Sequence, residues 1–180
     1  VLQCTSVGNP GDLKVREIDF TNNGLSHNTF GKDDEWFPME EVEVEVVIEN
    51  NGNDDIDDIE LQWGLWDTQE NQWIIDLDKE DEFNLKDGDK ETLTVTFKID
   101  DGMDVDLSDL GDDTDRYKFY VLAQGVVDNS GSDDTCASGF KEASIVLEND
   151  FVVLDNFQYP ETVQCSEEVT ITADAWNVGS

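Results

Sequence analysis

The sequence predicts an all-β chain folded as an antiparallel sandwich of two sheets. Hydrophobic and polar side chains alternate through several short segments, which is the period of a half-buried strand. Clusters of Gly, Asn and Asp separate these segments and are typical of tight turns. Stretches with helical periodicity are nearly absent, which argues against a parallel sheet built with crossover helices.

The clearest strand covers residues 42–48, in which every second side chain is Val or Ile and the intervening ones are mostly Glu. The turn cluster NNGNDD follows, and residues 59–66 then alternate in the same way. In that second segment Trp63 falls in phase with the core side chains, whereas Trp66 falls on the opposite face. About seven short strands of this kind match a two-sheet sandwich.

The other expected strands show weaker versions of the same alternation. They are Leu13 to Phe20, Trp73 to Leu77, Thr92 to Ile99, Tyr117 to Val127, and Ala143 to Leu147. A tight turn over KDGDK, from Lys86 to Lys90, should lead into the strand that begins at Thr92.

An internal repeat is the second strong signal. Residues 39–53 align without gaps on residues 166–180, with identical residues at five of the fifteen positions. Upstream, DLKVREIDF at 12–20 resembles DFVVLDNF at 150–157. We therefore expect a leader at 1–11, a sandwich at 12–148 and the start of a second, incomplete sandwich at 149–180. The alternative is a chance likeness of two strands, but the Asn-x-Gly that both copies share at the strand end is a specific turn signal.

These segments resemble the CARDB-type domains, cell-adhesion-related modules in secreted and surface proteins of archaea and bacteria. The likeness lies in VEVEVVIENNGNDDIDDIELQWGL, in FNLKDGDKETLTVTFKI and in residues 163–179. It covers about half of the chain and implies an Ig-like Greek-key sandwich used as a spacer or adhesive unit, with no catalytic residues. We expect an archaeal source. The long acidic insertions at 20–36 and 100–116 depart from the family pattern.

The charge of the chain limits its partners and its habitat. Asp and Glu number 45 against 10 Lys and Arg, so the formal net charge is -35. Nucleic acid is excluded as a partner because binding it requires a basic face. Salt screens the self-repulsion of such a chain, so we expect a high-salt, extracellular, cell-surface location. An acidic surface that holds divalent cations is the alternative.

Three cysteines and no long apolar run complete the compositional evidence. No segment approaches the roughly 20 apolar residues of a membrane span, so no transmembrane segment is expected in this chain. The cysteines lack zinc-type spacing. In an oxidising exterior we predict a disulfide between Cys4 and Cys136, at opposite ends of one sandwich, with Cys165 left over.

Catalysis finds little support in the sequence. The single histidine, His27, lies in a polar loop with no cysteine nearby, so neither a nucleophilic triad nor an imidazole zinc site is predicted. A pair of neighbouring carboxylates, as glycosidases use for acid–base catalysis, is expected by chance in a chain with 45 acidic residues and therefore does not indicate that activity. We predict that the protein is not an enzyme and requires no cofactor.

Calcium is the metal that this composition favours, because it binds clustered carboxylates. One loop offers a candidate ligand set, and a merely solvated acidic loop is the alternative. The candidates are Asp100, Asp101, Asp104, Asp106, Asp109, Asp112, Asp113 and Asp115.

Two tryptophans raise the possibility of a sugar site. Trp66 and Trp73 should point away from the core near one sheet edge, where they could form a platform for glycan stacking. The alternative is that they cover a sheet edge or contact a neighbouring module. The first functional hypothesis is therefore a structural or adhesive repeat of a surface layer, stalk or filament, with neighbouring modules or identical subunits as partners. The second is a calcium-dependent or carbohydrate-binding adhesion module.

Overall fold

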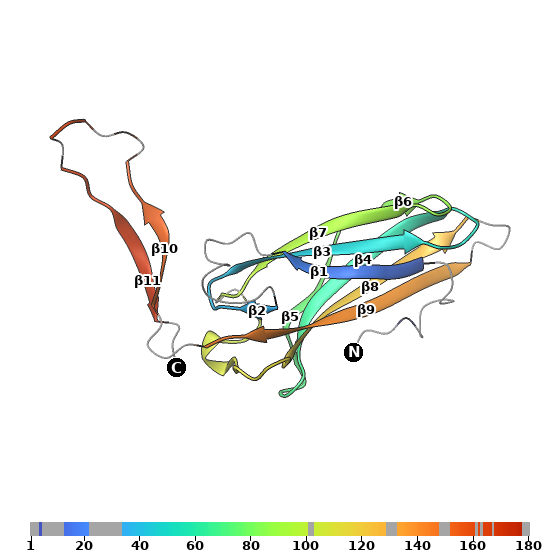
Figure 1. Ribbon diagram of the computed structural model, residues 1–180, viewed down its shortest axis with the longest axis horizontal. Coiled ribbons are helices and arrows are strands. Elements are labelled where there is room, and N and C mark those ends of the chain that lie inside the picture. Colours follow the sequence, from blue (N-terminus) through green and yellow to red (C-terminus); the bar gives the residue numbers. More distant parts are fainter. Residues whose placement is uncertain are drawn as a thin grey trace.

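Two antiparallel sheets form the body of the protein (Figure 1). The computed structural model describes residues 4, 13–21, 34–100, 103–128, 133–147, 152–160, 162, 164–166 and 168–177. The 3-stranded sheet has the order β1-β3-β7, with β1 (Leu13–Thr21), β3 (Glu41–Asn50) and β7 (Lys90–Lys98). Both of its pairings are antiparallel.

The larger sheet has six strands in the order β2-β9-β8-β4-β5, with β6 paired to β4. Its strands are β2 (Glu35–Trp36), β4 (Ile56–Asp67), β5 (Gln72–Lys79), β6 (Phe83–Leu85), β8 (Tyr117–Val127) and β9 (Asp134–Ile145). Only the short β2 pairs in parallel. Strands β1, β3 and β7 thus lie in one sheet and β4, β5, β8 and β9 in the other, which is the Ig-like Greek-key distribution. The predicted fold class is confirmed.

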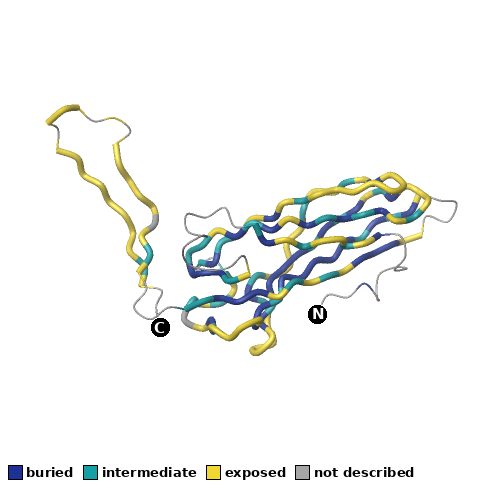
Figure 2. Tube along the Cα trace, viewed as in Figure 1, coloured by how far each residue is buried: buried dark blue, intermediate teal, exposed yellow. Residues whose placement is uncertain are grey.

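The core lies between the facing sides of the two sheets, as Figure 2 shows by burial. The alternating side chains of β3 and β4 are buried as predicted; they are Val42, Val44, Val46, Ile48, Ile59, Leu61, Trp63 and Leu65. Trp63 stacks on Phe97 from the small sheet and on Phe119 from the large one, with ring centroids 5.6 and 5.7 Å apart. The aromatic rings therefore join the two sheets through the centre of the molecule.

Some strand boundaries differ from the expected ones. The last strand was expected from Ala143 to Leu147, but β9 begins at Asp134. Its first half contains Ser138 and Gly139, which resemble a turn in sequence but take part in a ladder with β8. Strands β2 and β6 are too short to show a period of two.

A separate two-stranded sheet follows the sandwich. Strands β10 (Val152–Gln158) and β11 (Thr172–Asn177) pair only with each other among the described residues. Figure 1 shows this hairpin standing outside both sheets of the sandwich.

Candidate functional site

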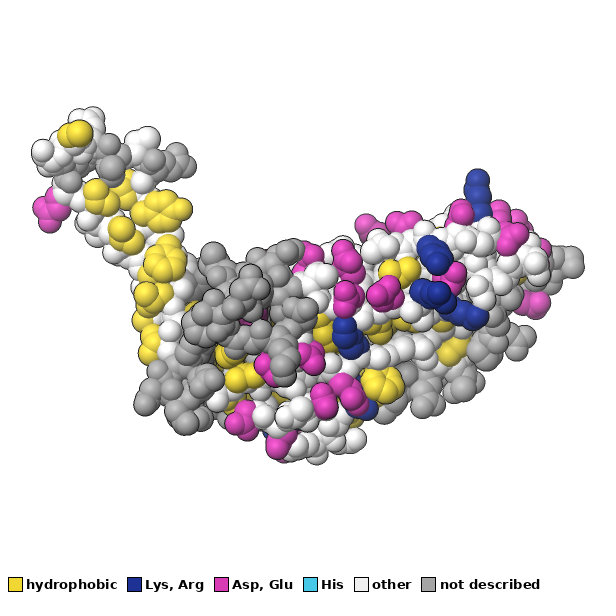
Figure 3. Space-filling model, viewed as in Figure 1, with side chains coloured by type: hydrophobic (Ala, Val, Ile, Leu, Met, Phe, Trp, Pro, Cys, Tyr) yellow, Lys and Arg dark blue, Asp and Glu magenta, His cyan; other side chains and the backbone are white. Residues whose placement is uncertain are grey.

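Three surfaces correspond to the functional residues that the sequence suggested: the acidic loop after β7, the outer face of the large sheet, and the β10–β11 hairpin. Figure 3 shows acidic side chains spread over the sandwich and hydrophobic side chains gathered on the hairpin. The described ranges contain no helix with the length and apolarity that a membrane crossing requires.

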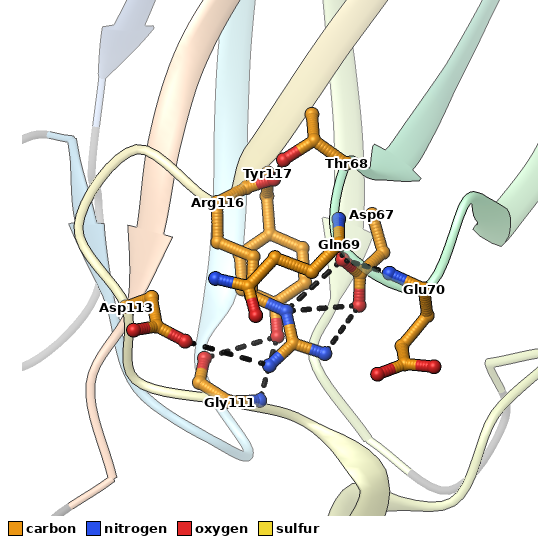
Figure 4. A network of polar contacts seen from close by, with 8 residues as sticks. All are labelled: Asp67, Thr68, Gln69, Glu70, Gly111, Asp113, Arg116 and Tyr117. Carbon is orange, nitrogen blue, oxygen red and sulfur yellow. Dashed lines mark hydrogen bonds and ion pairs between the residues drawn. The ribbon is translucent and has the colours of Figure 1, made fainter.

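The acidic loop is held against the β4–β5 turn by one buried ion pair (Figure 4). The Nη2 of Arg116 donates to Oδ2 of Asp67 at 2.6 Å, and its Nε lies 3.0 Å from both carboxylate oxygens. Oδ1 of Asp67 also accepts the backbone N–H groups of Gln69 and Glu70. Burial raises the pKa of Asp67, but these hydrogen bonds outweigh it and hold that pKa below its ordinary value.

The next two residues of the network fix the loop itself. The hydroxyl of Tyr117 donates to the backbone carbonyl of Gly111 at 3.0 Å and accepts the Gly111 N–H at 2.8 Å. A Cβ at Gly111 would lie 1.6 Å from Nη1 of Arg116, so a larger residue there would displace the guanidinium from its place beside Asp67. Asp113 adds a longer ion pair to Arg116 at 3.9 Å. This network is structural, because its charges are satisfied within the fold.

The predicted calcium ligands do not converge in the described part of the chain. No group of three or more His, Cys, Asp or Glu side chains placed to hold a metal ion occurs among the described residues. Asp104 instead accepts the backbone N–H of Asp76 at 2.9 Å, and Asp113 contacts Arg116. Asp101 lies outside the described residues. Calcium binding at this loop stays a prediction.

Trp66 and Trp73 lie together on the outer face of the large sheet. Their ring centroids are 5.0 Å apart and their planes meet at 75°. Gly64 permits this arrangement, because a Cβ there would lie 3.1 Å from the Trp73 ring. The row continues through Tyr120, 6.0 Å from Trp73, to Phe140, 5.5 Å from Tyr120. We call Trp66, Trp73, Tyr120 and Phe140 the outer aromatic strip.

The sequence identified only half of this strip. Tyr120 and Phe140 become neighbours through the β8–β9 register, and the part of β9 that carries Phe140 was not expected to be a strand. The edge-to-face contact of the two tryptophans does not offer two coplanar rings. Glycan stacking at Trp66 and Trp73 therefore stays a prediction that the ring geometry does not favour.

The hairpin repeats the pairing of β1 with β3. In the sandwich, Leu13 lies opposite Asn50 and Val15 opposite Ile48. In the hairpin, Val152 lies opposite Asn177 and Leu154 opposite Ala175. The gapless alignment of 39–53 on 166–180 places Asn177 on Asn50 and Ala175 on Ile48, so in both strand pairs this Asn lies opposite an apolar residue of the preceding strand.

The two copies differ in the burial of their apolar face. Val44 of β3 is 0% exposed beneath the large sheet, whereas its equivalent, Ile171, is 64% exposed. Five other large apolar side chains of the hairpin are also exposed, whereas Val153 and Trp176 on its opposite face are partly covered; the exposed ones are Val152, Leu154, Phe157, Tyr159 and Val169. Asn50 is buried, donates to the carbonyls of Asp54 and Leu85, and accepts the N–H of Gly52, so the shared Asn-x-Gly closes a turn.

A disulfide links Cys4 to Cys136, which is the predicted pair. Both residues are buried, and the Cys4 N–H donates to Oγ of Ser138 on β9. Cys165 is exposed and has a free thiol.

Comparison with known proteins gives likenesses of fold. No protein-family model and no curated protein matches the sequence. Among solved structures, the C-terminal domain of wzt is 11% identical, with a TM-score of 0.49 over 80% of this chain and 78% of that one. A CARDB domain of a Pyrococcus furiosus protein, in complex with di-metal ions, is 15% identical, with a TM-score of 0.42 over 76% and 94%.

A third similar structure is Spo0M, a sporulation control protein from Bacillus subtilis. It is 15% identical, with a TM-score of 0.40 over 83% of this chain, which spans 60% of the Spo0M chain. These likenesses are distant, and the assignment of the fold rests on the sheet order and core described above.

Proposed function

We propose that this chain is a non-enzymatic, extracellular structural or adhesive module from a tandem array of β-sandwiches. Residues 12–148 form one sandwich and residues 149–180 supply the first two strands of the next. The observation that carries the proposal is that β11, whose sequence aligns with that of β3, pairs antiparallel with the strand that precedes it, β10, as β3 pairs with β1.

The exposed face of the hairpin supports the same conclusion. Strands β1 and β3 bury this face against the large sheet of the sandwich, and β10 and β11 have no such cover among the described residues. A two-stranded hairpin alone is at best marginally stable in water. A covering sheet, supplied by further strands of the same polypeptide, would give Ile171 the surroundings of Val44.

Two other features support an extracellular location. Disulfides persist in oxidising surroundings and are rare in reducing ones, and Cys4–Cys136 ties the segment before β1 to β9. The net charge of -35 suits a salt-rich exterior in which repulsion is screened. The buried charged pair, Asp67 and Arg116, serves the fold, which leaves adhesion or assembly as the role that the described surfaces support.

Hydrogen exchange tests the proposal. Backbone amides of β11 should exchange rapidly in the fragment 1–180 and slowly, at rates close to those of β3, in the polypeptide at its natural length. The amides of β3 are the internal control and should be equally protected in both. Equal, rapid exchange of β11 in both proteins would show that no covering strands exist.

A matched pair of substitutions adds a second test in the natural-length polypeptide. Ile171→Asp places a charge at the position equivalent to buried Val44 and should unfold the second sandwich. Thr172→Asp, at the position equivalent to exposed Glu45, should leave it folded. Equal tolerance of both changes would contradict the proposed burial.

A further inference from the structure

The outer face of the large sheet carries an apolar surface that the core does not require. Alternation along β4 and β8 sends Trp63 and Phe119 into the core and Trp66 and Tyr120 to the opposite face. Phe140 on β9 extends this surface and is 52% exposed. Trp66 and Trp73 are partly exposed and Tyr120 is buried, at 7%, so Phe140 and the two tryptophans are the accessible part of the strip. Exposed apolar surface of this kind marks interaction sites in soluble proteins.

The charges that border the outer aromatic strip are balanced. On this face, Lys118 pairs with Glu142 at 3.1 Å and Lys79 pairs with Glu60 at 2.8 Å. The Lys79 and Gln62 hydrogen bonds lower the pKa of Glu60 and keep it ionised. These two neutral pairs add little repulsion at the contact itself, and molar salt screens the repulsion between two chains of net charge -35.

The polar groups around the strip are already engaged within the protein. Lys118 also lies over the ring of Phe140, with Nζ 4.3 Å from the centroid, and Gln62 donates to Glu60. A sugar needs both an open ring face and polar groups that can bind its hydroxyls. Because the polar groups beside the strip are already paired, the strip suits a flat apolar partner better than a sugar.

We propose that the outer aromatic strip binds the same strip of a second copy of this chain, so that the two large sheets pack against each other over the strips, beside the place where Cys4 is fixed to the same face at Cys136 and Ser138. The proposal rests on the assembly role proposed above and names the surface that performs it. A two-fold contact is self-complementary, because Phe140 of each copy can meet Trp66 and Trp73 of the other. Lys118 of each copy would then face Glu142 of the other, so that each strip offers both signs of charge.

Sedimentation equilibrium of the 180-residue protein in molar KCl tests the proposal. The wild-type chain should form dimers, and Phe140→Asp should weaken them at least about tenfold, as expected when an exposed aromatic anchor of an interface is replaced by a charge. Phe140 is half exposed, so this variant should fold, and an unchanged near-UV spectrum checks that it does. Thr94→Asp, on the outer face of the small sheet, is the matched control and should dimerise like the wild type.

Leu154→Asp separates this proposal from the role proposed for the hairpin. If dimers persist in Leu154→Asp and are lost in Phe140→Asp, the strip is the contact. Loss only in Leu154→Asp would assign self-association to the hairpin and overturn the proposal. A wild-type chain that stays monomeric would overturn it as well, and wild-type binding to an array of soluble glycans, lost in Phe140→Asp, would make the occupant a sugar. The hydrogen-exchange test of the tandem array is independent of all these results, so the two proposals can fail separately.

Discussion

Arg116 is the only buried cation among the described residues, and its partner Asp67 is equally enclosed. Removing one member of a buried pair leaves an uncompensated charge and typically costs about 3–5 kcal/mol. We expect Arg116→Met to lose stability of about this size in denaturant unfolding. The double variant Asp67→Leu/Arg116→Met should recover much of the loss, because it leaves no buried charge. A double variant as unstable as the single one would show that the loss does not come from an unpaired buried charge.

The same pair makes stability depend on pH. The pKa of Asp67 is lowered in the folded protein, whereas an unfolded Asp titrates near about 3.9. Its contribution is therefore fully present above that value and is lost as the pH falls through the lower, folded pKa. The melting temperature of the wild type, taken relative to that of Asp67→Leu/Arg116→Met, should therefore fall between pH 6 and about pH 2. A constant difference would contradict the assignment.

The disulfide between Cys4 and Cys136 should contribute to the stability of the sandwich. Loss of a native disulfide typically costs about 2–5 kcal/mol, so reduction or Cys136→Ala should lower the melting temperature. Cys165→Ala removes the exposed thiol and is the control, with no expected effect. Mass mapping without reduction should recover Cys4 and Cys136 in one linked peptide, and two free thiols there would disprove the linkage.

At the scale of single elements, the acidic loop between β7 and β8 allows a test of calcium binding. If its carboxylates bind the ion, millimolar calcium should raise the melting temperature above that in chelator at equal ionic strength. Asp104→Asn and Asp106→Asn together should abolish the difference. Magnesium at the same concentration is the control for unspecific screening. Identical curves with calcium and chelator would rule out the site.

Elements with strong alternation could be predicted from sequence, and those assembled by pairing could not. Strands β3 and β4 have a β-branched or large apolar side chain at every inward position before their last residues, Asn50 and Asp67, so their faces were evident. The first half of β9 is stabilised by its ladder with β8, in spite of Ser138 and Gly139. Its own residues did not indicate a strand.

The candidate sites likewise divide into those that the sequence indicates and those that only the pairing of strands brings together. The partnership of Cys4 with Cys136 was accessible because there are only three cysteines. The pairing of Asp67 with Arg116 spans 49 positions and was hidden among 45 acidic residues. Tyr120 and Phe140 join the outer aromatic strip through the register of β8 with β9, which no local pattern contains.

For the whole molecule, the net charge of -35 makes stability depend on salt. Raising KCl from 0.1 to 1 M shortens the Debye length from about 10 to about 3 Å, which weakens repulsion among carboxylates. Each kcal/mol recovered raises the melting temperature of a domain of this size by roughly 2–4 °C, so a rise of several degrees is expected. Sucrose at matched osmolality controls for general preferential exclusion. A melting temperature independent of KCl would contradict the expectation.

The Cys4–Cys136 disulfide also determines how the molecule would respond to mechanical tension. The chain leaves the sandwich through the end of β9, at Ile145, on its way to β10. A pull applied ahead of Cys4 and behind Val152 therefore passes through the disulfide and along β9 alone. The 132-residue separation that the bridge spans would remain locked against stretching. If the sandwich unfolded, the bridge would withhold about 450 Å of contour length until it was reduced, so the intact module would yield under load by little more than the length of one strand.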